Sequence, residues 1–101
     1  MSHKEIIYNE STSPNMSVQE NIDFRRWQLH LYRTLYTLME QGFSYENFLE
    51  KIKSLANLVC AKSDGYYVCI VNETADNIQL IFFPRPHQMA RTVFEIRYEV
   101  I

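Results

Sequence analysis

The side chains of this 101-residue chain that could take part in chemistry are spread along the sequence rather than clustered. His3 lies in a polar N-terminal segment, His30 in a helical pattern and His87 in a loop pattern. None of these histidines has a second metal ligand three or four residues away. Glu46 and Glu50 form a carboxylate pair on one face of a predicted helix. We interpret the histidines as surface groups and the glutamates as a solvated pair.

Motifs for nucleophilic catalysis and phosphate binding are absent from the sequence. With two glycines, the chain contains neither G-x-G-x-x-G nor G-x-x-x-x-G-K-S/T, and none of its serines lies in G-x-S-x-G. Cys60 and Cys69 form no C-x-x-C pair, and we interpret them as two buried, reduced thiols. The sequence therefore predicts a protein that is not an enzyme and that needs no cofactor or metal.

One basic and aromatic cluster, Arg25-Arg26-Trp27 together with Arg33, could contact phosphates or stack on a base. The net charge of −2 disfavours nucleic acid as a partner, because it provides no overall attraction for a phosphate backbone. Two other interpretations stay open. Trp27 could lie in the core with the arginines beside it. The cluster could equally form a protein interface, where Trp, Tyr and Arg are enriched.

The elements that must position these residues are predicted from a change in hydrophobic period near Gly65. Before it, apolar residues recur every three or four positions, which is typical of helices; after it, they form two continuous runs and one alternating run, which is typical of strands. Ser17 and Glu20 form a capping-box pattern that predicts a helix over 17–41. A second helix is predicted over 44–61, and both helices precede the strands.

Three strands are predicted over 66–71, 78–83 and 93–100. The expected fold is α+β, with two N-terminal helices packed on a three-stranded antiparallel sheet in the order ααβββ. Residues 1–16 are rich in polar groups and are predicted to form a flexible tail, so that residues 17–101 make up a single domain.

The last predicted strand alternates, with Phe94 and Ile96 toward the core. Its outward residues resemble a charged sheet edge that resists pairing with other chains, and they are Glu95, Arg97 and Glu99. Before this strand, Pro84-Arg85-Pro86 forms a stiff segment that either ends a strand or presents Arg85 to an acidic partner.

The first predicted helix has more apolar surface than one packing face needs. One stripe includes Trp27 and Leu31, and a second, adjacent stripe consists of Leu29, Tyr32, Tyr36 and Met39. A surface helix usually needs a single stripe of about 100°. The second stripe therefore predicts either a partner or a central helix that the chain itself covers on both sides. The residues expected to bind a partner are Arg26, Trp27, Leu29, Tyr32, Arg33, Tyr36, Met39 and Arg85.

Residues 45–59 and 64–71 together resemble the opening of a GAF-type sensor domain, and they are similar to the related autoinducer-binding domains of quorum-sensing regulators. In those families a helix of this pattern leads into a central strand that often begins with two tyrosines, here Tyr66-Tyr67, and a hairpin follows. An amphipathic helix of the quorum-sensing branch would correspond to the segment with Arg26-Trp27. The resemblance covers residues 22–83 and implies a small-ligand sensor that lacks the segment with most ligand contacts.

The function predicted from these observations is a small protein–protein interaction module, an adaptor, anti-activator or inhibitor that acts by surface binding. Its partner would be another protein or a second copy of the chain. The alternative is a GAF-like small-ligand sensor or transcription-regulator fragment with a pocket lined by Trp27, Tyr66, Tyr67 and Phe82. The chain shows neither the apolar run of a signal peptide nor a membrane-spanning run, which predicts a cytoplasmic location without membrane contact.

Overall fold

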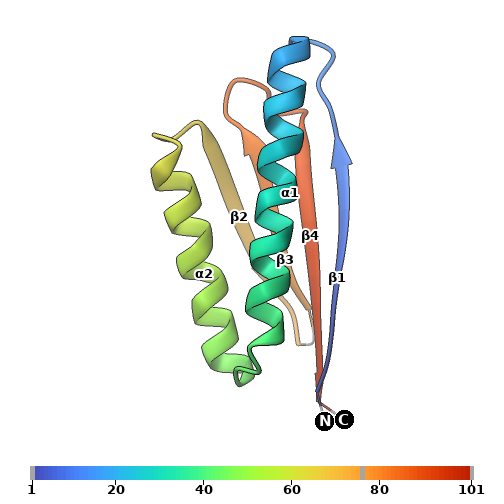
Figure 1. The fold of residues 1–101 in the computed structure, drawn as a ribbon, viewed down its shortest axis with the longest axis vertical. Helices are drawn as coiled ribbons and strands as arrows, with labels where there is room; N and C mark the ends of the chain where they lie inside the picture. The colour runs from blue at the N-terminus through green and yellow to red at the C-terminus, as the bar shows by residue number, and fades with distance from the viewer. Residues whose placement is uncertain (1, 76, 101) are drawn as a thin grey trace.

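The computed structural model describes the backbone of residues 2–75 and 77–100, and side chains within 5–75 and 77–97. In these ranges it has two helices that cover one face of a four-stranded sheet (Figure 1). The elements are β1 (Ser2–Ser11), α1 (Val18–Glu40), α2 (Tyr45–Lys62), β2 (Tyr67–Glu73), β3 (Asn77–Pro84) and β4 (Arg91–Val100). The strands lie in the order β1-β4-β3-β2, and every neighbouring pair is antiparallel. The predicted α+β class is confirmed.

Strand β1 is the main difference from the prediction, which had three strands and a flexible tail over 1–16. Residues 2–11 of that segment pair with β4, with Ile6 opposite Ile96. The reason for the error is that a short apolar stretch among polar residues does not specify a strand until a partner strand is present. That partner, β4, lies at the other end of the chain. The sheet therefore has four strands, and its first strand lies before both helices.

Strand β4 lies inside the sheet, between β1 and β3, so the interpretation of this strand as a charged edge is wrong. Its charged residues face residues of β1 instead: Glu95 lies opposite Ile7, and Arg97 lies opposite Glu5. The edges are formed by β1 and β2. The side chains of Tyr98, Glu99 and Val100 lie outside the described residues.

The predicted helix starts are confirmed. The Ser17 hydroxyl accepts a hydrogen bond from the Glu20 amide at 3.1 Å, and the Glu20 carboxylate accepts one from the Ser17 amide at 3.1 Å, which completes the capping box. The Ser44 hydroxyl accepts from the Asn47 amide at the start of α2. Between the helices, Gly42 adopts a left-handed φ of 73°, which lets the chain reverse within a few residues.

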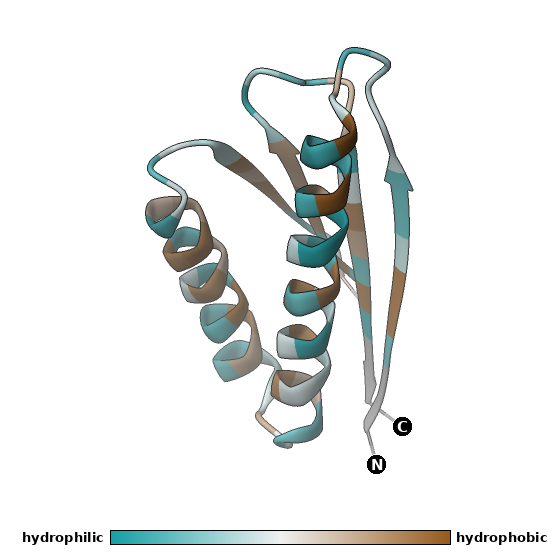
Figure 2. Cartoon of the chain, turned by 45° about the horizontal axis from the view of Figure 1, so that its top comes forward, coloured by the Kyte–Doolittle hydropathy of each residue, from teal (hydrophilic) through white to brown (hydrophobic). Residues whose placement is uncertain are grey.

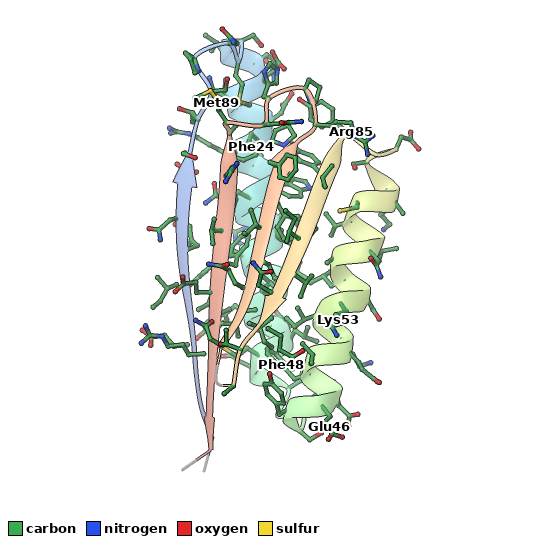
Figure 3. The ribbon with its side chains drawn as sticks, turned by 180° about the vertical axis from the view of Figure 1, so that it is seen from behind. Phe24, Glu46, Phe48, Lys53, Arg85 and Met89 are labelled. Atoms are coloured by element: carbon green, nitrogen blue, oxygen red, sulfur yellow. The ribbon has the colours of Figure 1, made fainter. Side chains whose placement is uncertain are left out.

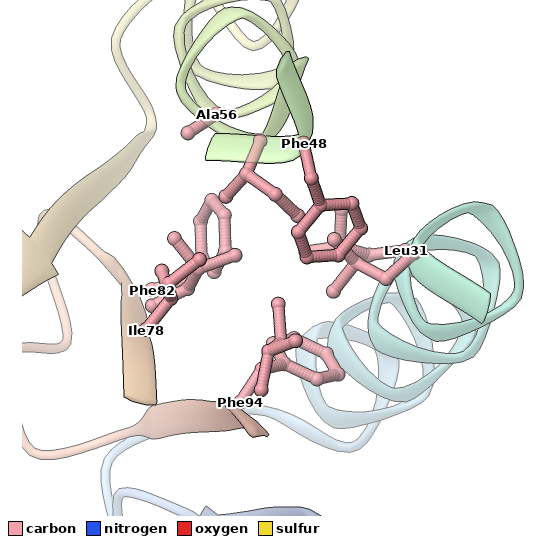
Figure 4. Close-up of a cluster of buried hydrophobic side chains, with 10 residues drawn as sticks. Leu31, Phe48, Ala56, Ile78, Phe82 and Phe94 are labelled. Carbon is pink, nitrogen blue, oxygen red and sulfur yellow. The ribbon is translucent and has the colours of Figure 1, made fainter. Parts of the chain in front are cut away.

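The core lies between the helix layer and the sheet. Leu31 of α1, Phe48 of α2, Phe82 of β3 and Phe94 of β4 point toward one another there and are at most 2% exposed (Figure 4). Every second residue of β3, from Ile78 onward, is buried on this face. Because side chains alternate along a strand, the intervening residues of the sheet lie on the face that no described helix covers.

The pairing of β1 with β4 can be tested with two neighbouring substitutions. Ile6 packs against the core, and Ile7 lies on the opposite face of the sheet, opposite Glu95. We expect Ile6→Lys to lower the free energy of unfolding by about 2–4 kcal/mol, because it brings a charge to the core. The matched control Ile7→Lys should lower it by less than about 1 kcal/mol, since its ammonium faces a carboxylate. Urea unfolding of both variants measures the difference, and equal effects would contradict the strand or its register.

Candidate functional site

A groove with a mainly apolar lining lies between α1 and α2. It has a cavity of about 500 Å³ toward the β2 end of α2. A second cavity of about 370 Å³ lies toward the connection between the helices. The two cavities share the lining residues His30, Thr34 and Leu55, so they form one continuous groove. The helices meet at the 41–44 connection and diverge from it (Figure 2).

The floor of the groove is aromatic. The indole of Trp27 stacks on the ring of Tyr67, with centroids 3.9 Å apart and planes 8° apart. Phe82 of the core contacts the indole edge-on, with centroids 5.3 Å apart. Burial raises the pKa of Tyr67 to about 12, so its phenol stays neutral over the physiological range. The stacked Trp27 and Tyr67 rings at this end of the groove therefore carry no charge.

The walls of the groove are aliphatic, and the exposure of their side chains ranges from the buried Leu31 to the exposed Leu58. The leucine and valine side chains that line it come from both helices and are Leu31, Leu38, Leu55, Leu58 and Val59. Leu58 is 52% exposed, although it lies in the middle of the second half of α2. A large aliphatic side chain left in water on the wall of a groove gains free energy when a ligand covers it.

The rim of the groove is basic. Arg33 of α1 and Lys51 and Lys62 of α2 line it together with His30, and no lining residue of either cavity is an aspartate or glutamate. This local excess of positive charge stands out because the whole chain has a net charge of −2. The ammonium of Lys51 also lies 5.3 Å from the ring centroid of Phe43, which holds it near the end of the groove.

The predicted second stripe of α1 is partly covered by the chain itself. The ring of Tyr32 packs on Tyr8 of β1 with centroids 5.2 Å apart, so the strand that the sequence analysis missed covers part of the stripe. Leu29 and Tyr36 remain 50% and 45% exposed. The chain itself thus covers Tyr32, whereas a partner for Leu29 and Tyr36 stays a prediction.

The remaining predicted partner-binding residues do not form one patch. Trp27 lies on the floor of the groove and Arg33 on its rim. Met39 packs against the core, whereas Arg26 is exposed on α1. Arg85 is exposed in the loop after β3. The structure therefore brings Trp27 and Arg33 into the groove and separates the others from it.

The basic and aromatic cluster proposed for nucleic acid is also dispersed. The indole of Trp27 stacks within the protein on Tyr67. The guanidinium of Arg25 lies 3.9 Å from the carboxylate of Glu10 on the side of β1. The Arg25 guanidinium and the Trp27 indole thus point to different sides of α1, and these two residues provide no joint surface for a base and its phosphate.

Sequence analysis missed the residues that α2 contributes to the groove, above all Leu58, Lys51 and Lys62. The available signal was Leu58 itself, a leucine outside the periodic core stripe that includes Ile52 and Ala56. The groove could not be predicted further, because its width depends on the angle between two helices.

A second apolar surface lies on the helix-free face of the sheet, which faces the viewer in Figure 3. Cross-strand neighbours place its apolar residues side by side, and they are Val68, Ile70, Ile81, Phe83 and Val93. Ile70 is 46% exposed. A polar row of Asn72, Gln79 and Glu95, joined by hydrogen bonds of 3.2 and 3.4 Å, borders this surface on one side.

His87 differs from the surface histidine expected. Its side chain is mostly buried, and its Nε2 lies 2.6 Å from a carboxylate oxygen of Glu20. The contact fastens the loop before β4 to the start of α1. The Glu20 carboxylate accepts hydrogen bonds from the Ser17 amide and from the His87 ring, and both lower the pKa of Glu20. His30 is exposed at the groove rim, and the side chain of His3 lies outside the described residues.

Within the described ranges, no three histidine, cysteine, aspartate or glutamate side chains come together as a metal site. None of the described helices is long and apolar enough to cross a membrane. No family model matches the chain, and neither the curated proteins nor the solved structures contain a match to it. Any function must therefore be argued from the surfaces of this fold.

The capping box and His87 predict how stability depends on pH. Because the folded state lowers the pKa of Glu20 from its ordinary value of 4.5, the carboxylate stabilises the fold above that pH, and the contribution is lost as the pH falls through the lowered value. As the pH is lowered from about 5 to roughly 3, we expect the free energy of unfolding to decrease less in the Glu20→Gln variant than in the wild type. Urea unfolding across this range measures how the free energy of unfolding changes with pH. The same pH dependence in the wild type and in the variant would contradict the assignment of this effect to Glu20. The matched control is Glu46→Gln, because it removes an exposed carboxylate of α2.

Proposed function

We propose that this protein is a small interaction module that acts by binding another protein, as an adaptor, anti-activator or inhibitor. The observation that supports this most strongly is the open, apolar groove between α1 and α2, with Leu58 more than half exposed on its wall. Exposed apolar surface that lines a groove and is bordered by polar residues is typical of protein-binding sites. Two free cysteines agree with a reducing, cytoplasmic location for this activity.

Binding fits the groove better than catalysis. Its lining consists of aliphatic and aromatic side chains, cations and the polar residues His30, Thr34, Thr37, Gln41 and Ser63, and it contains no carboxylate or thiol. The Ser63 hydroxyl donates a hydrogen bond to the Cys60 carbonyl. Cys69, two residues after Tyr67, is partly buried, and burial raises the pKa of its thiol to about 12, which leaves it a poor nucleophile at neutral pH. A surface of this composition supplies contact area and charge rather than a reactive group.

A small-ligand sensor is the second candidate, and one observation favours it. The Trp27 and Tyr67 end of the groove has a volume of about 500 Å³, which lies within the range of small-molecule pockets. The pocket predicted from the GAF resemblance differs in its lining, because Phe82 is fully buried and the indole packs on Tyr67 itself. We rank the sensor second, since the groove is open along the helices, whereas ligand pockets enclose most of their ligand.

Self-association is the second part of the proposal and uses the outer side of α1. The exposed residues of the second stripe, Leu29 and Tyr36, lie next to Tyr32 and to the guanidinium-bearing residues Arg26 and Arg33. Tyrosine and arginine are enriched at the centres of protein interfaces. Two copies of α1 related by a two-fold axis would cover this stripe with its own counterpart.

Photo-crosslinking tests the proposed function. A photoreactive phenylalanine analogue in place of Leu58 should form a covalent adduct with a protein of the native host, because the partner protein occupies the groove and lies next to position 58. The same analogue in place of Lys53 is the matched control, since Lys53 is exposed on the other side of α2 (Figure 3). We expect an adduct from position 58 that Trp27→Ala reduces by more than about tenfold. Equal labelling at both positions, or none at position 58, would contradict the proposal.

Light scattering over a concentration series tests self-association with Tyr36→Asp. Because Tyr36 is 45% exposed, we expect this variant to stay folded and to shift the mass from that of a dimer to that of the 12.1 kDa chain. Lys53→Asp is the control that leaves the mass unchanged. If the wild-type protein stays monomeric at all concentrations, the proposal of self-association is wrong, whereas the proposal that the groove binds a partner is not affected.

A further inference from the structure

We propose that the groove between α1 and α2 binds an acidic amphipathic helix of a partner protein. The inference rests on the proposed function and adds to it the chemistry of the occupant. It follows from three properties of the groove: its apolar floor, the charge of its rim, and its length.

The charge of the rim defines the flanks of the occupant. Arg33 lies on one wall, and Lys51 and Lys62 lie on the other, so cations border the apolar floor on both sides. No carboxylate lines either cavity to neutralise them. A ligand with carboxylates along both sides of an apolar face complements this arrangement, whereas a basic ligand would bring like charges together. The ammonium of Lys51 lies over the ring of Phe43, 5.3 Å from its centroid.

The length and shape of the groove define the backbone of the occupant. From Trp27 of α1 to Gln41, the C-cap residue of this helix, the lining residues span about 20 Å at about 1.5 Å per residue. A helix of about 14 residues has the same length, and its anchors at i, i+3, i+4 and i+7 match a trough between two helices. An extended peptide would instead seek unpaired strand edges, and these belong to β1 and β2 rather than to the groove walls.

The apolar anchors of such a helix would meet two different surfaces. At the wide end they would contact the stacked pair of Trp27 and Tyr67, and along the wall they would cover Leu58. Covering a half-exposed leucine and the free side of an indole removes apolar surface from water, which supplies the affinity. The rim charges then decide which amphipathic helices are accepted.

Synthetic helices and the fluorescence of Trp27 test the inference. Trp27 is the single tryptophan of the chain, so its emission reports directly on the groove floor. The probes are three peptides with the same leucine anchors, flanked by glutamate, glutamine or lysine. We expect the glutamate peptide to shift the emission saturably and to bind at least about tenfold more tightly than the lysine peptide. Raising the salt concentration should narrow this difference.

Charge reversal provides the decisive variant. The double substitution Lys51→Glu and Lys62→Glu should invert the order of the peptides, so that the lysine peptide binds more tightly. Lys53→Glu changes the charge of the same helix by two units outside the groove and should leave the order unchanged. Circular dichroism before each titration ensures that the variants compared are folded.

Three results would overturn the inference. Equal affinity for the glutamate and lysine peptides would mean that apolar contact alone selects the occupant. Binding of oleate without any peptide would make the groove a site for small amphiphiles. A lack of response to every probe would exclude a helix of this kind. In each case the crosslink at position 58 still decides whether the groove binds a protein, so the inference and the proposed function can fail separately.

Discussion

The stacking of Trp27 on Tyr67 is the contact on which the shape of the helix layer depends. Tyr67 is the first residue of β2, and its amide donates to the Ser63 hydroxyl, which in turn donates to the Cys60 carbonyl at the end of α2. The indole thus joins α1 to the sheet at the point where α2 ends. Stacked aromatic pairs of this kind contribute more free energy than their buried area alone would supply.

This arrangement explains why a groove persists between the helices. At the 41–44 connection the left-handed Gly42 holds α1 and α2 close together, but at the other end each helix is held by the sheet rather than by the other helix. Side chains of the core fill the space beneath them, down to the fully buried Phe48. Above that core the helices diverge (Figure 2). Leu58 is left half in water there, in the cavity that Lys62 also lines. The groove is therefore a consequence of how the two helices are anchored.

The local signals in the sequence were sufficient to predict much of the fold. The capping box at Ser17, the cap at Ser44 and the alternation around Phe94 predicted the helices and the core face of the last strand. Strand β1 could not be predicted in this way, because its pairing with β4 joins opposite ends of the chain. Of the predicted site residues, Trp27 and Arg33 line the groove. The residues of α2 that complete it could not be found, since no local pattern encodes the angle between two helices.

The measurement that tests this account most directly is a set of intermolecular nuclear Overhauser effects between the labelled protein and an unlabelled glutamate-flanked helix. We predict contacts from the peptide leucines to the Trp27 indole and the Leu58 methyl groups, with none to the Ile70 methyl group on the helix-free face of the sheet. Contacts that cluster on Ile70, or on Tyr36 at the outer side of α1, would contradict the account, because they would place the binding surface away from the groove.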